Sequence, residues 1–364
     1  MYQTPQPYTP VAPYETPRRV RRRSPRFLVA LLPMAFVAFM VFGFSYLVSP
    51  EPDIEVQPGV GAASVDGRDV VLVPYERHGA RGMVQLIARD MFQVRLAAAD
   101  PATGEVLWDT QLSDQLIWNA SVLAAGERYA YLATDDGLVV VDLRGGAIVA
   151  RGDGVTGLGG QFVAARSAYG YDAASHRVVA MNADGAVLAI PLDNPVAAPA
   201  DQETAAAWVG ALSTKTSLPT VQATADKAAL GADGRVELRE RPGAPGGVLV
   251  RVAADGTETP AGVTVFHGAA IVLDGEAAAG SASGHVLVRH TRTVNDTGLV
   301  LSSVSLTTGA VTGSLDLTSA PDRTIALPGG TTVVAAGDQV VALGADGRLT
   351  ALRVGATGFF GSPS

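Results

Sequence analysis

The sequence predicts an all-β protein, a β-propeller of about seven four-stranded blades, with six or eight possible, preceded by one transmembrane α-helix. Three observations lead to this prediction. A charge-free apolar run lies near the N-terminus, and a strand–turn–strand phrase recurs through the rest of the chain. The 41 glycines and 22 prolines among 364 residues also suit many short strands joined by tight turns.

The apolar run, residues 27–48, has the length of a transmembrane helix. Its 22 residues contain no charged side chain. At about 1.5 Å per residue they extend roughly 33 Å, enough for a hydrocarbon core of about 30 Å. Residues 1–26 are rich in Pro, Tyr and Thr and contain six arginines, so we expect a disordered basic tail.

The distribution of arginine predicts the orientation of this helix. Six arginines precede it and none follows for about twenty residues, so the positive-inside rule puts the N-terminus in the cytoplasm. The alternative is a cleaved signal peptide, which has a shorter apolar region and an Ala-x-Ala-like site that residues 45–50 lack. We therefore predict a single-pass type II signal-anchor in a bacterial plasma (inner) membrane, with the C-terminal domain periplasmic or extracellular. The bacterial source is inferred from the near absence of lysine.

A strand–turn–strand phrase recurs six times in the predicted ectodomain. Its copies close on Gly104, Gly146, Gly185, Gly256, Gly309 and Gly347. The residue seven before the glycine is apolar in five copies, as is the residue two after it. Glycine suits such a turn because it reaches positive φ without a Cβ clash. Each copy is therefore predicted to be a β-hairpin.

The spacing of these glycines predicts the number of blades. Successive glycines lie 42, 39, 71, 53 and 38 residues apart, close to the 40–45 residues of a propeller blade except at the long third step. That step contains Asp233-Gly234, a possible seventh copy, and residues 201–212, a possible helical insertion. The predicted boundaries are a tail at 1–26, the transmembrane helix at 27–48, a linker at 49–60, the propeller at 61–358 and a C-terminal tail at 359–364.

Two stretches of the repeat resemble the pyrroloquinoline-quinone-like (quinoprotein-type) propeller family. Residues 131–148 match the first half of that family's repeat, and Asp100 with residues 103–108, TGEVLW, matches the second. The resemblance implies a quinone stacked on tryptophan and a calcium ion, often with adjacent cysteines. This chain has no cysteine. Trp108 stands where the repeat itself has tryptophan, and Trp118 and Trp208 are expected to pack in the core or loops. The prediction is thus a non-catalytic member without cofactor.

Composition excludes several classes of function. Without cysteine there are no disulfides, thiolate metal sites or lipidated N-terminal cysteine. Beyond residue 50 the chain has 21 basic and 34 acidic side chains, a net charge of −13, which disfavours nucleic acid as a partner. His285 and His290 lie five apart and would point to opposite faces of a strand, so no shared metal site is expected. No catalytic residues stand out.

One segment, residues 74–81, concentrates mixed charge and an aromatic side chain in an otherwise weakly charged domain. Tyr75, Arg77, His78 and Arg81 are its candidate partner-binding residues, on a segment expected to be a loop. The function predicted is a membrane-anchored extracytoplasmic module that binds an envelope protein or a ligand without catalysis. The alternatives are a degenerate quinoprotein-like or hydrolytic enzyme with its site in the propeller funnel, and a sensor signalling through its short tail.

Overall fold

The computed structural model describes residues 26–214, 223–356 and 358–359. The basic tail at 1–25 and most of the expected C-terminal tail lie outside these residues. The apolar run forms one continuous helical rod made of α1 (Arg26–Ala38), the π-helical segment η1 (Phe39–Phe44) and α2 (Ser45–Val48). Among the described residues it is the one helix long and apolar enough to cross a membrane, and residues 31–48 are not buried against the rest of the protein.

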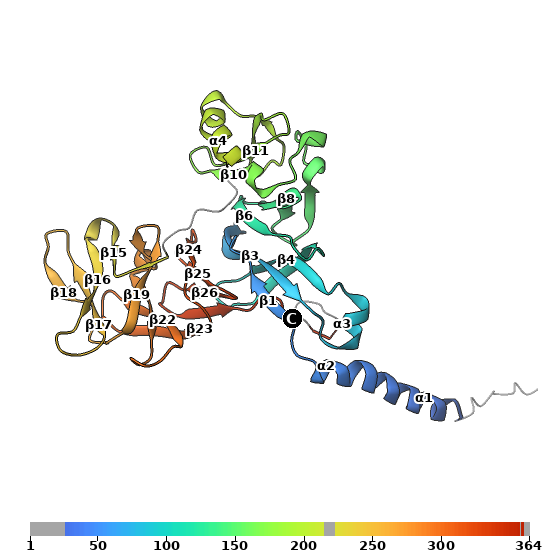
Figure 1. Ribbon diagram of the computed structural model, residues 1–364, viewed down its shortest axis with the longest axis horizontal. Helices are drawn as coiled ribbons and strands as arrows, with labels where there is room; N and C mark the ends of the chain where they lie inside the picture. Colours follow the sequence, from blue (N-terminus) through green and yellow to red (C-terminus); the bar gives the residue numbers. More distant parts are fainter. Residues whose placement is uncertain (1–25, 215–222, 357, 360–364) are drawn as a thin grey trace, which may run out of the picture.

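The remaining chain folds into antiparallel sheets, which we number as blades 1 to 6 in chain order (Figure 1). Blade 1 contains β1 (Asp53–Val56), β2 (Gly61–Val65), β3 (Arg68–His78), β4 (Phe92–Ala99) and β5 (Val106–Ser113), with α3 (Gly82–Ala88) between β3 and β4. Blade 2 contains β6 (Ala120–Ala125), β7 (Tyr129–Thr134), β8 (Gly137–Asp142) and β9 (Ile148–Arg151). Blade 3 contains β10 (Tyr169–Asp172), β11 (Arg177–Met181), β12 (Val187–Pro191) and β13 (Ala198–Pro199), followed by α4 (Gln202–Thr214).

Blades 4 and 5 are connected in one sheet, and blade 6 ends the chain. Blade 4 contains β15 (Lys227–Ala229), β16 (Arg235–Glu240), β17 (Gly247–Val252) and β18 (Glu258–Pro260). Blade 5 contains β19 (His267–Asp274), β21 (His285–Thr291), β22 (Leu299–Ser305) and β23 (Val311–Leu317), with the short strands β14 (Thr224–Ala225) and β20 (Ala277–Ala278) alongside. Blade 6 contains β24 (Arg323–Ala326), β25 (Thr332–Ala336), β26 (Gln339–Leu343) and β27 (Leu349–Leu352).

The six sequence phrases correspond one to one with the six blades. In five blades the phrase is the hairpin between the last two strands, and in blade 3 it joins β11 to β12. All six turn glycines have positive φ, between 69° and 85°. The described residues thus form six blades, one of the counts that the repeat spacing left open rather than the central value of seven.

The long third step of the repeat contains both features that the sequence suggested. The helical insertion at 201–212 is α4, and Asp233-Gly234 is the turn between β15 and β16 of blade 4 rather than a seventh phrase. Within the stretch 49–60 expected as a linker, β1 pairs with β3 of blade 1. The first blade therefore begins closer to the apolar helix than the sequence indicated.

Hydrophobic cores between neighbouring blades place the six blades along an arc. Separate clusters of buried side chains join blade 3 to blade 2, blade 2 to blade 1, blade 1 to blade 6, blade 6 to blade 5 and blade 5 to blade 4. Within the described ranges no such cluster joins blade 3 to blade 4. Figure 1 shows blade 3 at the top of the view and blade 4 at the left.

Each end of the arc has a surface suited to water. On blade 3, α4 covers the outer face, with Leu212 and Trp208 packed on β11 and β12. On blade 4, the free face of β16 carries alternating charges in which Arg235, Glu237 and Arg239 form ion pairs, with Glu258 of β18 extending the row. Terminal units of repeat proteins need such polar or capped outer faces because no further repeat covers them.

Candidate functional site

The segment with the predicted partner-binding residues is mostly strand, not loop. Residues 68–72 of β3 pair with β2 and residues 75–78 pair with β1, while β4 pairs along the other edge. Pro74 lies between the residues of β3 that pair with β2 and those that pair with β1. Its missing backbone N–H therefore removes no hydrogen bond from either pairing. Because side chains alternate along a strand, Tyr75 and Arg77 point to one face and Glu76 and His78 to the other.

Tyr75 is fully buried and belongs to a polar network inside blade 1. Its hydroxyl donates to Asp109 Oδ2 at 2.5 Å, and Arg95 Nε donates to Asp109 Oδ1 at 2.9 Å. Burial, reinforced by the Asp109 carboxylate, raises the pKa of Tyr75 far above its usual value. Tyr75 therefore supports the interior of the blade and offers no surface to a partner.

Arg77 is also buried, and it fixes the position of α3. Its guanidinium donates to Gln85 Oε1 at 2.5 Å, and Gln85 Nε2 donates to the carbonyl oxygen of Gly358 at 3.0 Å. Burial lowers the pKa of Arg77. The Nε of Arg77 has no partner in the described part of the chain. Arg77 thus ties the strand, α3 and the end of the chain together.

Arg81 joins blade 1 to the apolar helix. Its guanidinium lies 4.5 Å from the ring centroid of Tyr46, donates to the Tyr46 carbonyl oxygen at 3.3 Å and pairs with Glu51 at 2.8 Å. Gly82 lies so close to the same helix that a Cβ added to it would be 2.7 Å from Tyr46 Cα. The helix is therefore docked on blade 1 by specific contacts.

His78 belongs to a group of three potential metal ligands that the sequence analysis missed. Ligand atoms of Glu55, Glu76 and His78 lie within 4.8 Å of one another, because Glu55 is opposite Glu76 in the β1–β3 ladder and His78 is two residues further on the same face. Gln57 Nε2 donates to Glu76 Oε1 at 2.8 Å. This set could bind a divalent cation. The pattern Glu-x-His on a strand was the available signal, but its partner Glu55 lay in the expected linker.

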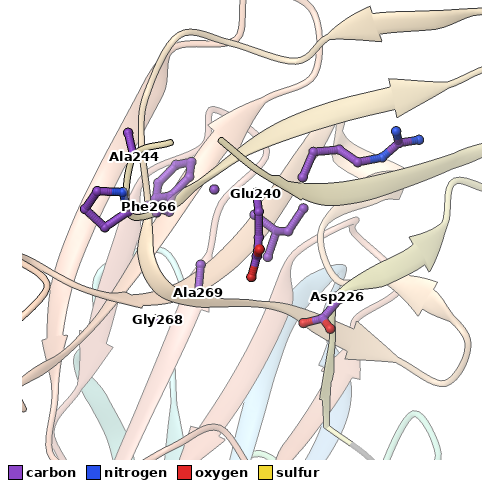
Figure 2. A pocket seen from close by; sticks show the side chains of 11 residues that line it. Asp226, Glu240, Ala244, Phe266, Gly268 and Ala269 are labelled. Carbon is purple, nitrogen blue, oxygen red and sulfur yellow. The ribbon is translucent and has the colours of Figure 1, made fainter. Parts of the chain in front are cut away.

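A pocket of about 380 Å³ opens on blade 4 at its junction with blade 5 (Figure 2). Figure 2 shows the carboxylates of Asp226 and Glu240 toward one end and Phe266 with Ala244 toward the other. No ion pair involving either carboxylate occurs among the described residues. The rest of the lining is made of Leu238, Arg239, Pro245, Gly246, Gly247, Gly268 and Ala269. The Arg239 guanidinium forms ion pairs with Glu237 and Glu258. Such a pocket suits a ligand with a cationic or amide group attached to a small apolar part.

A second hollow, between blades 1 and 2, is larger, and four of its five charged side chains form ion pairs with one another. It measures about 660 Å³ and is lined by Ser64, Asp66, Gly67, Glu127, Arg128, Asp142 and Arg144. Arg144 pairs with Asp66 at 2.8 Å and Arg128 with Asp142 at 3.6 Å. Binding a charged ligand here would require breaking these pairs.

The tryptophans and histidines considered at the sequence level lie in separate places. Trp108 Nε1 donates to the Leu143 carbonyl oxygen at 2.7 Å inside the core between blades 1 and 2, as expected for blade packing, and Trp118 is buried in the same core. His285 and His290 lie at opposite ends of β21, where each bonds to its own neighbours. The structure brings none of these side chains together into a cofactor cradle.

Comparison with known proteins gives weak likenesses. No family model matches the chain, and no curated protein does. Among solved structures, an apo form of AtxE2 isopeptidase aligns with a TM-score of 0.36 and 9% identity over 85% of this chain. The alignment covers 53% of the isopeptidase, so this chain spans about half its length.

Two bacterial proteins align less closely. BamB from Moraxella catarrhalis gives a TM-score of 0.21 and 13% identity over 83% of this chain and 91% of its own. PorZ, a surface component of the type-IX secretion system of Porphyromonas gingivalis, gives 0.24 and 12% over 84% of this chain and 40% of its own. At these TM-scores none of the three likenesses assigns a function to this chain.

Proposed function

We propose that the protein is a membrane-anchored extracytoplasmic module that binds an envelope protein or ligand without catalysing a reaction. The apolar helix serves as an uncleaved anchor, with the basic tail in the cytoplasm and the six blades outside. Support for the anchor comes from the exposed apolar rod and from the contacts of Arg81 and Gly82 that dock it on blade 1.

The observation that carries the binding proposal is the pocket on blade 4. Its two carboxylates have no ion-pair partner in the described ranges, whereas both arginines of the hollow between blades 1 and 2 are already paired with carboxylates there. A preformed cavity with a few convergent polar groups beside an aromatic ring is the usual form of a recognition site. We propose that it receives a basic or amide-bearing side chain of an envelope protein.

Site-specific photo-crosslinking in the native membrane tests this proposal. A photo-reactive amino acid replaces Ala244 at the pocket, or Ala174 on an exposed turn of blade 3 as the matched position. We expect a discrete adduct from Ala244 and none from Ala174. The pair Asp226→Asn with Glu240→Gln should reduce the yield at least several-fold, whereas Asp136→Asn with Asp184→Asn, two exposed turn acids, should leave it unchanged.

Two results would overturn the binding proposal. One is the same adducts from Ala244 and Ala174, which would indicate random collision. The other is a yield that does not respond to loss of the pocket carboxylates. Release of the full-length protein from membranes by alkaline carbonate would refute the anchor independently of either result.

A further inference from the structure

The short helix α3 has its polar side turned inward and its apolar side turned outward. Gln85 is 1% exposed and bonded to Arg77, while Met83, Leu86 and Ile87 are 36%, 49% and 69% exposed. These three positions follow the i, i+3, i+4 pattern of one helix face. Soluble helices have the opposite arrangement, so this face is made for an apolar environment.

The position of α3 beside the membrane helix identifies that environment. The backbone N–H of Met83 donates to Ser45 Oγ at 3.0 Å, so the first turn of α3 lies level with Ser45. Ser45 is three residues before Val48, where the apolar helix ends. At 1.5 Å per residue, this is about 5 Å inside the end of the span, the depth at which interfacial amphipathic helices insert their apolar face.

Two further features fit the boundary between lipid and water. Tyr46 and Arg81 stack at this level, and aromatic rings with cationic neighbours are typical of the headgroup region. Met91, 43% exposed, adds an exposed apolar side chain to the connection between α3 and β4. The hydrogen bonds among Arg77, Gln85 and Gly358 prevent α3 from rotating about its axis to bury this surface.

We propose that α3 and Met91 insert into the outer leaflet of the membrane that the anchor crosses, forming a second lipid contact. This inference rests on the proposed anchor. A single helix can tilt in the bilayer together with the blade docked on it, and a second lipid contact beside it fixes the orientation of blade 1 relative to the bilayer. The occupant of the apolar surface is thus lipid, not a protein partner or a second copy of the chain.

Depth-dependent fluorescence quenching tests this inference on the full-length protein in vesicles of phosphatidylethanolamine and phosphatidylglycerol. The chain has no cysteine, so single substitutions accept a thiol-reactive fluorophore selectively. Three variants are compared: Ile87→Cys on α3, Phe36→Cys near the middle of the apolar span, and Ala102→Cys in the exposed β4–β5 turn. The last lies on the same blade but at the far end of β4 from α3.

We expect a nitroxide near the lipid headgroup to quench Ile87→Cys more than one near the acyl-chain end, with the reverse order for Phe36→Cys. Ala102→Cys should show no loss of emission with either lipid. A second pair of substitutions, Met83→Ser with Leu86→Ser, should reduce the quenching at Ile87→Cys without changing that at Phe36→Cys, because it removes the apolar surface and leaves the anchor intact.

The outcomes separate this inference from the anchor on which it depends. Quenching at Phe36→Cys without quenching at Ile87→Cys would overturn the lipid contact and leave the anchor standing. Absence of quenching at both positions would refute the anchor itself. A signal at Ile87→Cys that depends on the protein-to-lipid ratio and not on the nitroxide lipid would mean that a second copy covers α3, and would equally overturn the inference.

Discussion

At the scale of single residues, the polar interior of blade 1 makes a testable contribution to stability. Tyr75→Phe removes a buried hydroxyl that donates to the Asp109 carboxylate. We expect the free energy of unfolding to fall by about 2 kcal/mol, because hydrogen bonds to charged groups contribute about 1.5–3 kcal/mol. Urea titration of the full-length protein in detergent measures this change. Tyr171→Phe, which loses an exposed bond to His176, is the control and should change little. Equal losses would show that burial of the Tyr75 network is unimportant.

The buried tyrosines also predict loss of stability in alkali. Burial raises the pKa of Tyr169 to about 12 and that of Tyr75 and Tyr131 further. The folded state therefore keeps these phenols neutral, and their contribution is complete below the unfolded pKa of about 10 and is lost as the pH rises above it. Unfolding free energies measured between pH 7 and 11 should fall above pH 10. The unfolding free energy of the Tyr75→Phe variant should fall less steeply with pH. An unchanged slope would contradict this account.

The candidate residues show what a sequence can indicate at this scale. Alternation along a strand separates Tyr75 and Arg77 from Glu76 and His78, yet the mixed charge of the segment suggested a loop. The sequence does not reveal that β1 and β4 flank the segment, and it is this pairing that buries Arg77. Arg81 is different, since its contact with Tyr46 depends on the helix being docked against the blade.

At the scale of elements, two turn glycines that look alike in sequence should differ in their tolerance of substitution. Gly185 has a φ of 80° with open space around it, whereas a Cβ at Gly146, with a φ of 70°, would lie 2.5 Å from the Trp108 ring. Gly185→Ala should lower the unfolding free energy by about 1 kcal/mol through backbone strain alone. Gly146→Ala should cost more, because Trp108 must also move. Thermal melting of both variants compares them, and equal shifts in Tm would disprove the crowding at Gly146.

Elements defined by local pattern were predictable, and the number of blades was less so. The six hairpin phrases and the helical insertion α4 correspond to sequence signals, turn glycines in one case and a run of good helix formers in the other. Dividing the chain by an average blade length overcounted, because α4 and the turns between β9 and β10 occupy chain without adding a blade. β1 was missed because its four residues follow the apolar helix too closely to resemble a separate strand.

At the scale of the whole molecule, the proposed orientation predicts which positions reach an external reagent. With Ala254→Cys on the exposed β17–β18 turn, intact cells treated with a membrane-impermeant maleimide should label the protein. The Thr16→Cys variant, substituted in the basic tail, should be labelled only after the cells are permeabilised. The positive-inside argument gives the reason. Labelling of Thr16→Cys in intact cells would reverse the proposed topology.

The open arc predicts unequal distances between neighbouring turns. Spin labels at Ala183→Cys on blade 3 and Ala254→Cys on blade 4 should lie farther apart than labels at Ala254→Cys and Thr308→Cys on blade 5. A core cluster joins blades 4 and 5, and none joins blades 3 and 4 within the described ranges. Pulsed dipolar spectroscopy of the full-length protein measures both pairs. Similar distances would mean that the blades close into a ring. The sequence could not decide this, because blade repeats are equally compatible with a ring or an arc.

The place where the chain starts and ends within the arc has a mechanical consequence. Blade 1, the first in sequence, packs on blade 6, the last, through one core cluster, and Arg323 of blade 6 donates to the Pro58 carbonyl oxygen at 2.6 Å. The proposed anchor therefore joins the arc where the first and last blades meet, with blades 2 and 3 on one arm and blades 5 and 4 on the other. If the proposed anchor crosses a membrane, a force applied to either arm is transmitted to it through blade 1 without passing through the opposite arm.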